Sequence, residues 1–352
     1  MKSCAINHKS LTEMLISHGN KILIMKPSSL GDIIHTIPVL QAIKRQFPSV
    51  FVYWFVLKEY EGLVNQLEHV DGTIPFFRHG FRKSPLHYIR SQLATIKKLR
   101  RGNFDMVLDF QGLFRSALFC YVSGAPVRFG FSWKNEPNRL FYNVYASVNR
   151  EKHALDRTVE LAKQLGIEVE GEDFRARFRD FKPLKLNLEH GNVIAFCPGG
   201  RWPSKRWPAE NYALLAKYVV EKMGVEVVLV GSGEEVNLGE IITEKIKKGV
   251  TNLIGKTPLE ALPAVLENAR VVVTNDSGPM HLAAALGKKV IAFFGPTDPM
   301  RTGPYGRGHV VLTANVSCRP CFKRTCEMGL ECMKSITVNK VAEEVEKLLD
   351  LK

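Results

Sequence analysis

One stretch indicates the fold class: residues 270–281 read Arg-Val-Val-Val-Thr-Asn-Asp-Ser-Gly-Pro-Met-His. The apolar run 270–273 predicts a buried strand, and a helical pattern begins at Met280, so the residues between them form a tight turn. Residues 290–299, Val-Ile-Ala-Phe-Phe-Gly-Pro-Thr-Asp-Pro, repeat the strand and the turn. Two neighbouring strands therefore end at one edge of a parallel sheet, which is where open α/β sheets bind ligands.

The two turns offer backbone amides, hydroxyls and carboxylates at that edge. A helix that starts there attracts anions through its unpaired N–H groups and its dipole. We therefore predict a pocket for a phosphorylated ligand such as a nucleotide. The alternative for Asp276 to Pro279 is a strand–helix turn that is well capped and binds nothing.

Length and composition limit the class of protein. A chain of 352 residues predicts two domains, each able to bury a core. The 49 Lys and Arg against 35 Asp and Glu give a net charge of +14, which favours a nucleic acid, an anionic membrane surface or a phosphorylated substrate as partner. The sequence has no apolar run of about 18 residues, so we expect no transmembrane helix. Residues 1–20 lack the apolar core of a signal peptide, and we expect a loose extension there.

The first half begins with a strand and a polar loop. Residues 21–26 are apolar enough for a strand, and a helical pattern covers residues 33–46. Pro38 lies inside that pattern, so we expect the helix to kink or restart near Thr36. The loop offers hydroxyls, a backbone amide and a carboxylate from Ser28, Ser29, Gly31 and Asp32. These groups suit a sugar or phosphate acceptor with Asp32 as base; the alternative is a carboxylate that caps the helix start.

Two further stretches of the first half carry groups that can bind anions. Residues 105–109 predict a strand, and the polar turn after it contains Gln111 and Arg115, of which Arg115 can bind a phosphate. Residues 78–101 are strongly basic and interleaved with aromatic side chains. They can hold an anionic lipid or a phosphorylated sugar, or they form the solvated face of a helix.

The second half restarts the strand–turn–helix pattern after a predicted linker at residues 181–191. Strand 193–197 leads into a basic loop that is rich in Gly and Pro. In this loop Gly199 and Gly200 allow close backbone approach, and Lys205 can neutralise a diphosphate. The loop lacks the Gly-Lys-Ser/Thr order of a P-loop.

A pair of carboxylates follows the next predicted strand, residues 225–230. Glu234 and Glu235 lie one short turn beyond it, where a carboxylate can accept hydrogen bonds from ribose hydroxyls. The alternative is an acidic helix N-terminus. The first strand of the chain is not followed by the Gly-x-Gly-x-x-Gly pattern, which argues against a dinucleotide oxidoreductase.

Four of the seven cysteines are clustered near the end of the chain. Cys318, Cys321, Cys326 and Cys332 can bind zinc or an iron–sulfur cluster, although only the first interval is Cys-x2-Cys. The alternatives are a disulfide clip, reduced structural thiols or a redox function. Seven cysteines in a chain of this length do not suggest a disulfide scaffold, which favours the cytoplasm.

Five motifs in this order resemble glycosyltransferase family 9, the ADP-heptose:lipopolysaccharide heptosyltransferases. They occupy residues 26–32, 109–116, 198–208, 275–281 and 294–299. The resemblance covers about residues 21–350. The segment Cys-Arg-Pro-Cys-Phe-Lys-Arg-x-Cys is more similar to heptosyltransferase II than to heptosyltransferase I.

The resemblance implies a GT-B fold: two Rossmann-like α/β domains with parallel sheets that face each other across a cleft. Residues 21–180 would bind the acceptor, residues 192–337 would bind the ADP-sugar, and residues 338–352 would form a C-terminal helix. It also implies an inverting, metal-independent transfer of heptose from ADP-L-glycero-β-D-manno-heptose to the Kdo or heptose of the lipopolysaccharide inner core. Catalysis would require no cofactor, and a structural metal is possible only at the four cysteines.

The resemblance also implies roles for single residues. Asp32 would deprotonate the acceptor hydroxyl, while Lys205 and the amides around Ser277 and Gly278 would stabilise the departing diphosphate. Donor contacts would come from Gly199, Gly200, Glu234 or Glu235, Asp276, Ser277, Gly278, His281, Thr297 and Asp298. Acceptor contacts would come from Ser28, Ser29, Gly31, Gln111 and Arg115.

The expected acceptor is Kdo-lipid A or inner-core lipopolysaccharide. A basic amino-terminal domain suits such a phosphorylated lipid at the anionic inner leaflet, so we expect a cytoplasmic protein bound peripherally to the inner membrane, with no nucleic-acid partner. Two other functions remain open. A nucleotide-sugar epimerase can share this two-domain architecture, and a basic nucleic-acid-binding protein fits the net charge alone.

Overall fold

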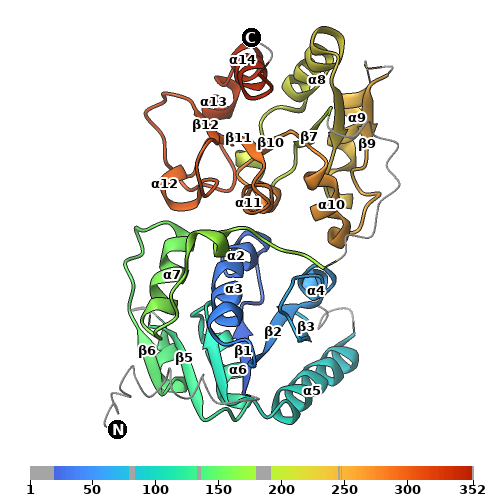
Figure 1. Cartoon of the computed structure of the whole chain (residues 1–352). Helices are drawn as coiled ribbons and strands as arrows, with labels where there is room; N and C mark the ends of the chain where they lie inside the picture. The colour runs from blue at the N-terminus through green and yellow to red at the C-terminus, as the bar shows by residue number, and fades with distance from the viewer. Residues whose placement is uncertain are drawn as a thin grey trace. The chain divides into compact units, whose positions relative to one another are not determined.

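Each half of the chain builds its own parallel six-stranded sheet (Figure 1). The chain divides into two units, Met1–Asp180 and Phe181–Lys352. The computed structural model describes residues 20–78, 84–132, 136–179, 192–244, 246 and 248–350. The predicted linker, residues 181–191, and the predicted extension, apart from its last residue, lie outside the described residues.

The first unit orders its strands β3-β2-β1-β4-β5-β6, and all neighbouring strands are parallel. These strands are β1 Lys21–Met25, β2 Phe51–Leu57, β3 Gly72–Phe76, β4 Met106–Asp109, β5 Val127–Phe131 and β6 Val144–Ala146. The chain first adds strands on one side of β1 and then continues on the other side with β4. The switch point of the sheet, where doubly wound folds bind ligands, therefore lies between β1 and β4.

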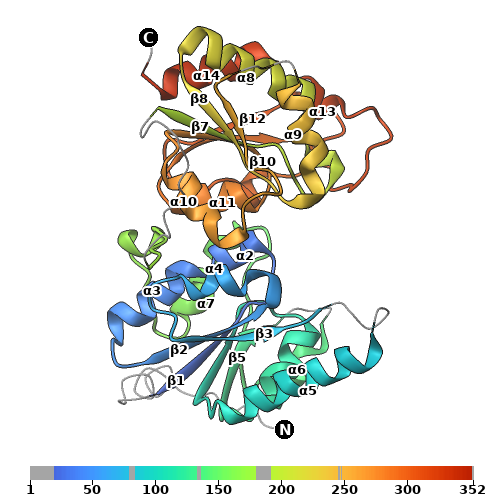
Figure 2. The ribbon, with the colours of Figure 1, turned by 90° about the vertical axis from the view of Figure 1, so that its right-hand side faces the viewer.

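Helices cover both faces of this sheet. They are α2 Leu30–Ile34, α3 Ile37–Gln46, α4 Glu61–Asn65, α5 Pro85–Arg101, α6 Phe114–Val122 and α7 Ala154–Lys163, with the short 3-10 helices η1 Lys58–Tyr60, η2 Pro137–Phe141 and η3 Gly171–Phe174. Figure 2 shows α3 and α7 on one face and α5 and α6 on the other. The α5–α6 side buries a core of aromatic and aliphatic side chains that includes Phe55, Leu99 and Ala117.

The predicted helix restart near Thr36 is confirmed. Helix α2 ends at Ile34 and α3 begins at Ile37, with Pro38 in the first turn of α3, where its missing N–H costs no hydrogen bond. Helix α2 starts at Leu30 rather than at the predicted Ile33. The reason is a capping box, in which the Asp32 carboxylate accepts the N–H of the preceding turn.

The second unit repeats the topology of the first. Its strand order is β12-β11-β10-β7-β8-β9, all parallel, so β7 and β10 hold the places that β1 and β4 hold in the first unit. The strands are β7 Val193–Cys197, β8 Glu226–Leu229, β9 Val250–Asn252, β10 Val271–Asn275, β11 Lys289–Phe294 and β12 Val310–Thr313. Strands β7, β10 and β11 are buried almost throughout, as their apolar runs predict for strands covered on both faces.

The helices of the second unit pack around this sheet. They are α8 Ala209–Met223, α9 Val236–Thr243, α10 Leu262–Glu267, α11 Gly278–Ala285, α12 Pro299–Thr302, α13 Glu331–Lys334 and α14 Val338–Leu348, with η4 Pro203–Lys205, η5 Gly233–Glu235 and η6 Leu259–Ala261. The C-terminal helix α14 packs on α8 and β11, and its Val341 and Val345 join the core of this unit.

The basic stretch predicted between residues 78 and 101 is largely helix α5; residues 79–83 lie outside the described residues. Only Thr95 and Leu99 of α5 are buried, so the helix presents most of its surface to solvent. Within the described ranges no helix is long and apolar enough to cross a membrane.

Candidate functional site

The carboxyl edge of the second sheet gathers the loops that follow β7, β10 and β11. Asn275, at the end of β10, is fully buried and donates hydrogen bonds to the carbonyl oxygens of Pro198 and Gly199 at 2.8 and 2.9 Å. Its own side-chain oxygen accepts the backbone N–H of Trp207 at 2.9 Å. One amide side chain therefore fixes both ends of the 198–208 loop to the switch point of the sheet.

Lys205 lies at the centre of this edge. Its ammonium nitrogen is 2.6 Å from the Asp276 carboxylate, and both side chains are largely buried, with exposed fractions of 18% and 4%. The hydroxyl of Thr297 donates to the same Asp276 oxygen at 2.7 Å. The Lys205 ammonium also lies 4.6 Å from the centre of the Trp202 ring. Lys205 and Thr297 thus both contact the Asp276 carboxylate, and these three predicted residues come from three separate loops.

Of the two candidate glutamates, Glu235 is the one that faces the glycine loop. Its carboxylate accepts the N–H of Gly200 at 2.9 Å and the N–H of Ser232 at 2.8 Å. A Cβ atom on Gly199 would lie only 1.9 Å from a Glu235 oxygen, so a side chain at this position would displace the Glu235 carboxylate. Glu234 is exposed on η5. The sequence spacing could not decide which of the two glutamates faces the ligand. In the structure Glu235 contacts the glycine loop, whereas Glu234 is exposed.

Helix α11 begins at this edge with Ser277 as its N-cap, Gly278 as its first residue and Pro279 in its first turn. The Ser277 hydroxyl makes no cap hydrogen bond and lies 3.3 Å from the hydroxyl of Thr274. Within α11, His281 is almost fully buried. The first-turn N–H groups of an α-helix have no partner inside the helix, so they are suited to an anion.

Asp298 has a structural role at the start of helix α12. Its carboxylate accepts the N–H of Met300 at 2.9 Å and so caps helix α12. Asp298 is therefore a helix cap, and its place after β11 keeps it at the same edge as Thr297.

The corresponding edge of the first sheet holds Asp32 and Lys26. One Asp32 oxygen accepts the N–H and the hydroxyl of Ser29 at 2.8 and 2.9 Å, and the other lies 3.5 Å from the Lys26 ammonium. The Asp32 side chain is still 42% exposed. The carboxylate is therefore both a helix cap and a group that solvent can reach. Ser28 is half-buried before this turn and Gly31 is buried within it.

Lys26 was not predicted as a site residue. It is buried at the end of β1, and its ammonium donates to the carbonyl oxygen of Phe110 at 2.7 Å, in the turn after β4. This cation therefore joins the two loops of the switch point, next to Asp32. A lysine directly after a buried apolar run was the available signal, but in sequence it is indistinguishable from an ordinary strand end.

The turn after β4 is organised by a buried carboxylate, Asp109. One of its oxygens accepts the N–H groups of Gln111 and Gly112 at 2.8 and 3.0 Å, and the other accepts the Tyr142 hydroxyl at 2.6 Å. Burial raises the pKa of Asp109 above its usual value, although these hydrogen bonds oppose the shift. The turn leaves Gln111 half-buried, and Arg115 is exposed in the first turn of α6.

The cysteine segment supports the donor-side loops. Arg319 donates to the carbonyl oxygens of Gly295 and Thr297 at 2.7 and 3.3 Å. The hydroxyl and the N–H of Ser204, next to Lys205, donate to the backbone carbonyls of residues 323 and 324 at 2.6 and 3.3 Å. The segment between the clustered cysteines thus contacts two of the three loops that surround Asp276.

The cysteines themselves do not form a metal site in the structure. Cys318 and Cys321 are exposed, whereas Cys332 is buried and burial raises the pKa of its thiol. All four clustered cysteines, with Cys326 partly exposed, have free thiols. Among the residues that the structure describes, no group of three or more His, Cys, Asp or Glu side chains is arranged to hold a metal ion. The predicted metal therefore receives no support from the geometry.

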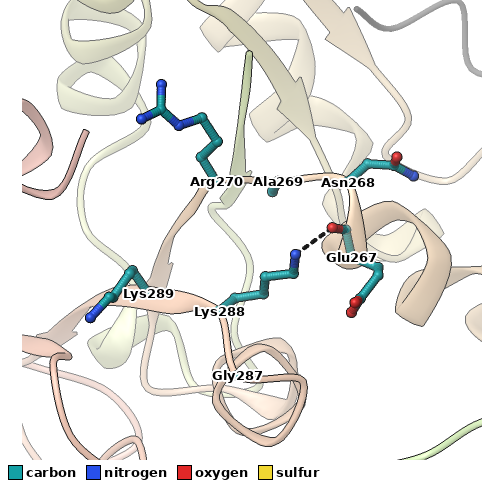
Figure 3. A pocket seen from close by; sticks show the side chains of 7 residues that line it. All are labelled: Glu267, Asn268, Ala269, Arg270, Gly287, Lys288 and Lys289. Carbon is teal, nitrogen blue, oxygen red and sulfur yellow. Dashed lines mark hydrogen bonds between the residues drawn. The ribbon is translucent and has the colours of Figure 1, made fainter. Parts of the chain in front are cut away.

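One open pocket of the second unit lies away from these loops (Figure 3). Its lining comes from residues 267–270, before β10, and residues 287–289, before β11. In it, Lys288 points across the opening and donates to the carbonyl oxygen of Glu267. These residues are at the amino ends of the strands, opposite to the edge where α/β sheets bind ligands, so we do not assign the donor to this pocket.

Comparison with known proteins identifies the family. The model of glycosyltransferase family 9 (heptosyltransferase) matches residues 92–331. Lipopolysaccharide heptosyltransferase 1 of Pseudomonas aeruginosa is 30% identical over 341 residues, which cover 94% of this chain and 91% of that protein. The chain belongs to glycosyltransferase family 9. It is therefore an enzyme, a glycosyltransferase, and its two parallel sheets are those of the GT-B fold.

Family members of both types resemble the chain. Lipopolysaccharide heptosyltransferase 2 of Escherichia coli K12 is 27% identical, with 94% of this chain and 98% of that protein covered. The structure of E. coli heptosyltransferase WaaC with ADP is 28% identical, has a TM-score of 0.76 and covers 93% of this chain and 99% of that one. These identities are too close to favour either type, so the preference for type II stays a prediction.

Proposed function

We propose that this family 9 glycosyltransferase transfers heptose from ADP-L-glycero-β-D-manno-heptose to a Kdo or heptose residue of the lipopolysaccharide inner core. The proposal is supported by relatives named as lipopolysaccharide heptosyltransferases and by a similar structure that holds ADP. The observation on this chain that carries it is the pairing of Lys205 with Asp276 at the start of α11. A cation and free helix N–H groups at one sheet edge suit a sugar diphosphate.

In this proposal the second unit binds the donor. The Lys205 ammonium and the N–H groups at Ser277 and Gly278 stabilise the charge that develops on the departing ADP. Asp276 holds Lys205 in place before the donor arrives, because the two side chains already form an ion pair. Glu235 is the carboxylate proposed for the ribose, and its contact with Gly200 keeps the glycine loop open to the diphosphate.

The remaining predicted donor residues also contact ADP-heptose in this proposal. Gly199 lets the loop backbone approach the ligand, and Thr297, Asp298 and His281 surround the sugar and its diphosphate. Glu234 is kept as the second candidate for the ribose.

The first unit binds the acceptor in this proposal. Asp32 accepts the proton of the attacking acceptor hydroxyl, so the oxygen can form the new glycosidic bond with inversion at the sugar carbon. Lys26 is a positioning residue, since its ammonium lies 3.5 Å from an Asp32 oxygen and also donates to the carbonyl oxygen of Phe110. Ser28, Ser29, Gly31, Gln111 and Arg115 line the acceptor loops, and Arg115 suits an acceptor phosphate.

Lys205 and the start of α11 supply the positive charge that a metal supplies in other transferases, so we propose that catalysis needs no metal. A chelator is expected to leave the transfer rate unchanged, and metal analysis of the purified protein tests the four cysteines separately. We also propose a cytoplasmic enzyme that binds the inner membrane peripherally, because its acceptor is a lipid.

A mass-spectrometric transfer assay tests the function. The protein is incubated with ADP-heptose and defined acceptors that carry either no heptose or one heptose. Addition of one heptose, with release of ADP that depends on the acceptor, supports the proposal and identifies the acceptor type. Conversion of a nucleotide sugar without any acceptor would instead show the epimerase activity, for which family membership gives no support. Salt-sensitive binding to a nucleic-acid duplex without affinity for ADP would also contradict the proposal.

A further inference from the structure

The exposed apolar side chains of the first unit are concentrated on one layer. The described part of the chain has ten large exposed apolar residues in this unit, and six of them lie on helices α5 and α6. Helix α5 contributes Leu86, Ile89 and Leu93, with exposed fractions of 72%, 46% and 59%. Scattered exposed apolar residues are ordinary, but such a concentration on one layer marks an interaction surface.

Helix α6 continues the apolar surface of α5. Phe114, Leu118 and Tyr121 are 45%, 38% and 57% exposed, and their spacing of four and three residues places them on one face of α6. Helices α5 and α6 pack against each other on the same face of the sheet (Figure 2). Leu99 of α5 and Ala117 of α6 are buried in the core, so each helix packs one side on the sheet and leaves its exposed apolar residues at the surface.

The charge of these two helices has one sign. Helices α5 and α6 contain six Lys or Arg residues and no Asp or Glu. On α5, Arg90 and Lys97 share the outward face with Leu86 and Leu93, because these positions fall within a quarter turn of one another on a helix with 3.6 residues per turn. All four side chains are exposed. An apolar stripe flanked only by cations is the pattern of a helix that lies in a membrane interface.

A hollow between the two helices adds a place for an anionic head group. Arg100 of α5, Tyr121 of α6 and Arg128 of β5 line it, and no carboxylate does. The Arg128 guanidinium lies 5.6 Å from the centre of the Tyr121 ring and is held by hydrogen bonds to the carbonyl oxygens of Phe141 and Ala125 at 2.8 and 2.6 Å. This combination suits a phosphate group that enters from a bilayer surface.

We propose that the outer layer formed by α5 and α6 docks the protein on an anionic membrane surface. The purpose of the docking rests on the proposed function, since a lipid-linked acceptor is held in such a membrane. Helix α6 begins at Phe114, three residues after Gln111, and so connects the layer to the proposed acceptor loop. Docking through this layer places that loop near the plane in which the acceptor is anchored.

Vesicle sedimentation with the full-length protein tests the proposal. The probes are vesicles of phosphatidylcholine with phosphatidylglycerol, and vesicles of phosphatidylcholine alone. We expect the protein to sediment with the anionic vesicles, and to be released as the salt concentration rises, because its contacts with the head groups are electrostatic.

Paired substitutions separate the apolar and the charged contribution. Leu86→Ser with Leu93→Ser, and separately Arg90→Gln with Lys97→Gln, are each expected to lower the partition coefficient at least about tenfold. Matched controls on the second unit are Leu214→Ser with Ile241→Ser, and Lys217→Gln with Lys222→Gln, all at exposed positions. These controls are expected to bind as the parent does.

Three results overturn the docking surface. The first is unchanged binding of both α5 variants, and the second is equal binding of the parent to neutral and anionic vesicles. The third is a parent that forms a dimer together with a Leu86 and Leu93 variant that is a monomer. This result would make the layer an interface between copies of the chain. Since all substituted side chains are exposed, we expect thermal midpoints close to that of the parent, which excludes unfolding as the cause of lost binding.

Failure of the docking surface can be told apart from failure of the proposed function. Transfer to a deacylated, water-soluble acceptor needs no membrane, so both α5 variants are expected to transfer heptose to it at the parent's rate. If vesicle binding depends on this layer but heptose is transferred to no acceptor, the docking surface is supported and the proposed function is wrong.

Discussion

At the scale of single residues, the two proposed reactive side chains are each held by a partner of opposite charge. Lys205 is paired with a buried carboxylate at 2.6 Å, and Asp32 lies 3.5 Å from the buried ammonium of Lys26. Lys205 and Asp276 come from different loops, whereas Lys26 and Asp32 both follow β1. Both pairs are formed without a ligand, so little reorganisation of these side chains is needed when substrates bind.

Replacement of Lys205 by Ala tests the donor side. We expect kcat to fall by roughly a hundredfold or more, as for the loss of one donor that stabilises a transition state. Steady-state kinetics with ADP-heptose measures this effect. Lys217→Ala, at an exposed position of α8, is the matched control. Kinetics equal to those of the parent would remove Lys205 from the site.

Replacement of Asp32 by Asn tests the acceptor side. The amide oxygen can still accept the N–H of Ser29, so the start of α2 is kept while the base is lost. We expect kcat to fall by about 10²- to 10⁴-fold with unchanged ADP affinity. Calorimetric titration with ADP and a rate measurement check both parts. Glu59→Gln, an exposed carboxylate of the same unit, is the control; turnover of Asp32→Asn within a few-fold of the parent rules the base out.

The sequence predicted these reactive groups and some of their partners, such as Asp276, but not Lys26. Asp276 follows β10 directly, and Asp32 lies in the first turn of the helix after β1, so both positions at the sheet edge suggest a ligand. Lys26, Asn275 and Asp109 form contacts with segments 33 to 84 residues away in the chain. Such contacts depend on which strands become neighbours, and no local pattern records that.

At the scale of elements, the glycine loop after β7 is fixed by side chains from two other loops. Asn275 holds its ends, while Glu235 accepts the N–H of Gly200. The loop therefore cannot relax independently of β10 or η5. Its shape depends on the absence of a side chain at Gly199, where the Glu235 carboxylate occupies the space.

Gly199→Ala tests this arrangement. The new methyl group would lie 1.9 Å from a Glu235 oxygen, so the carboxylate must leave and its hydrogen bond to Gly200 is lost. We expect the Michaelis constant for ADP-heptose to rise at least about tenfold, as for a lost charge-assisted hydrogen bond. Gly200→Ala is the matched comparison, because its methyl group would meet only Arg206 at 3.7 Å. Equal effects of the two substitutions would contradict the steric argument.

Most elements could be predicted from periodicity, because buried parallel strands are continuous apolar runs. The range of β7, Val193–Cys197, agrees with the prediction to the residue, and the restart of the helix near Thr36 follows from Pro38. The starts of helices were less accurate. Helix α11 begins at Gly278 rather than Met280, since Ser277 already acts as the N-cap.

At the scale of the whole molecule, the strand order could not be read from the sequence; it entered only through the resemblance to a family. Apolar runs show that strands exist, but any parallel order buries them equally well. Because the chain returns past β1 to place β4, and past β7 to place β10, each unit has a switch point. Those two points decide which of the strand-end loops become neighbours.

Buried Asp109 makes the stability of the folded chain depend on pH. Burial raises the pKa of this carboxyl above 3.8, so the folded state keeps the proton at pH values where the unfolded chain has lost it. The folded state then binds more protons, and stability falls as pH rises from 3.8 through the raised pKa. We expect the thermal midpoint of Asp109→Asn, relative to the parent, to rise over this range. A difference that stays constant with pH would show that burial does not raise this pKa.

The repeated strand order has a consequence for how such an enzyme can diversify. Each unit has a complete sheet with helices on both sides and a core of its own, so changes in one set of loops leave the packing of the other intact. Preference for the donor sugar and preference for the acceptor can then drift under separate selection. We expect chimeras that exchange one whole unit between relatives to fold more readily than chimeras that exchange single loops.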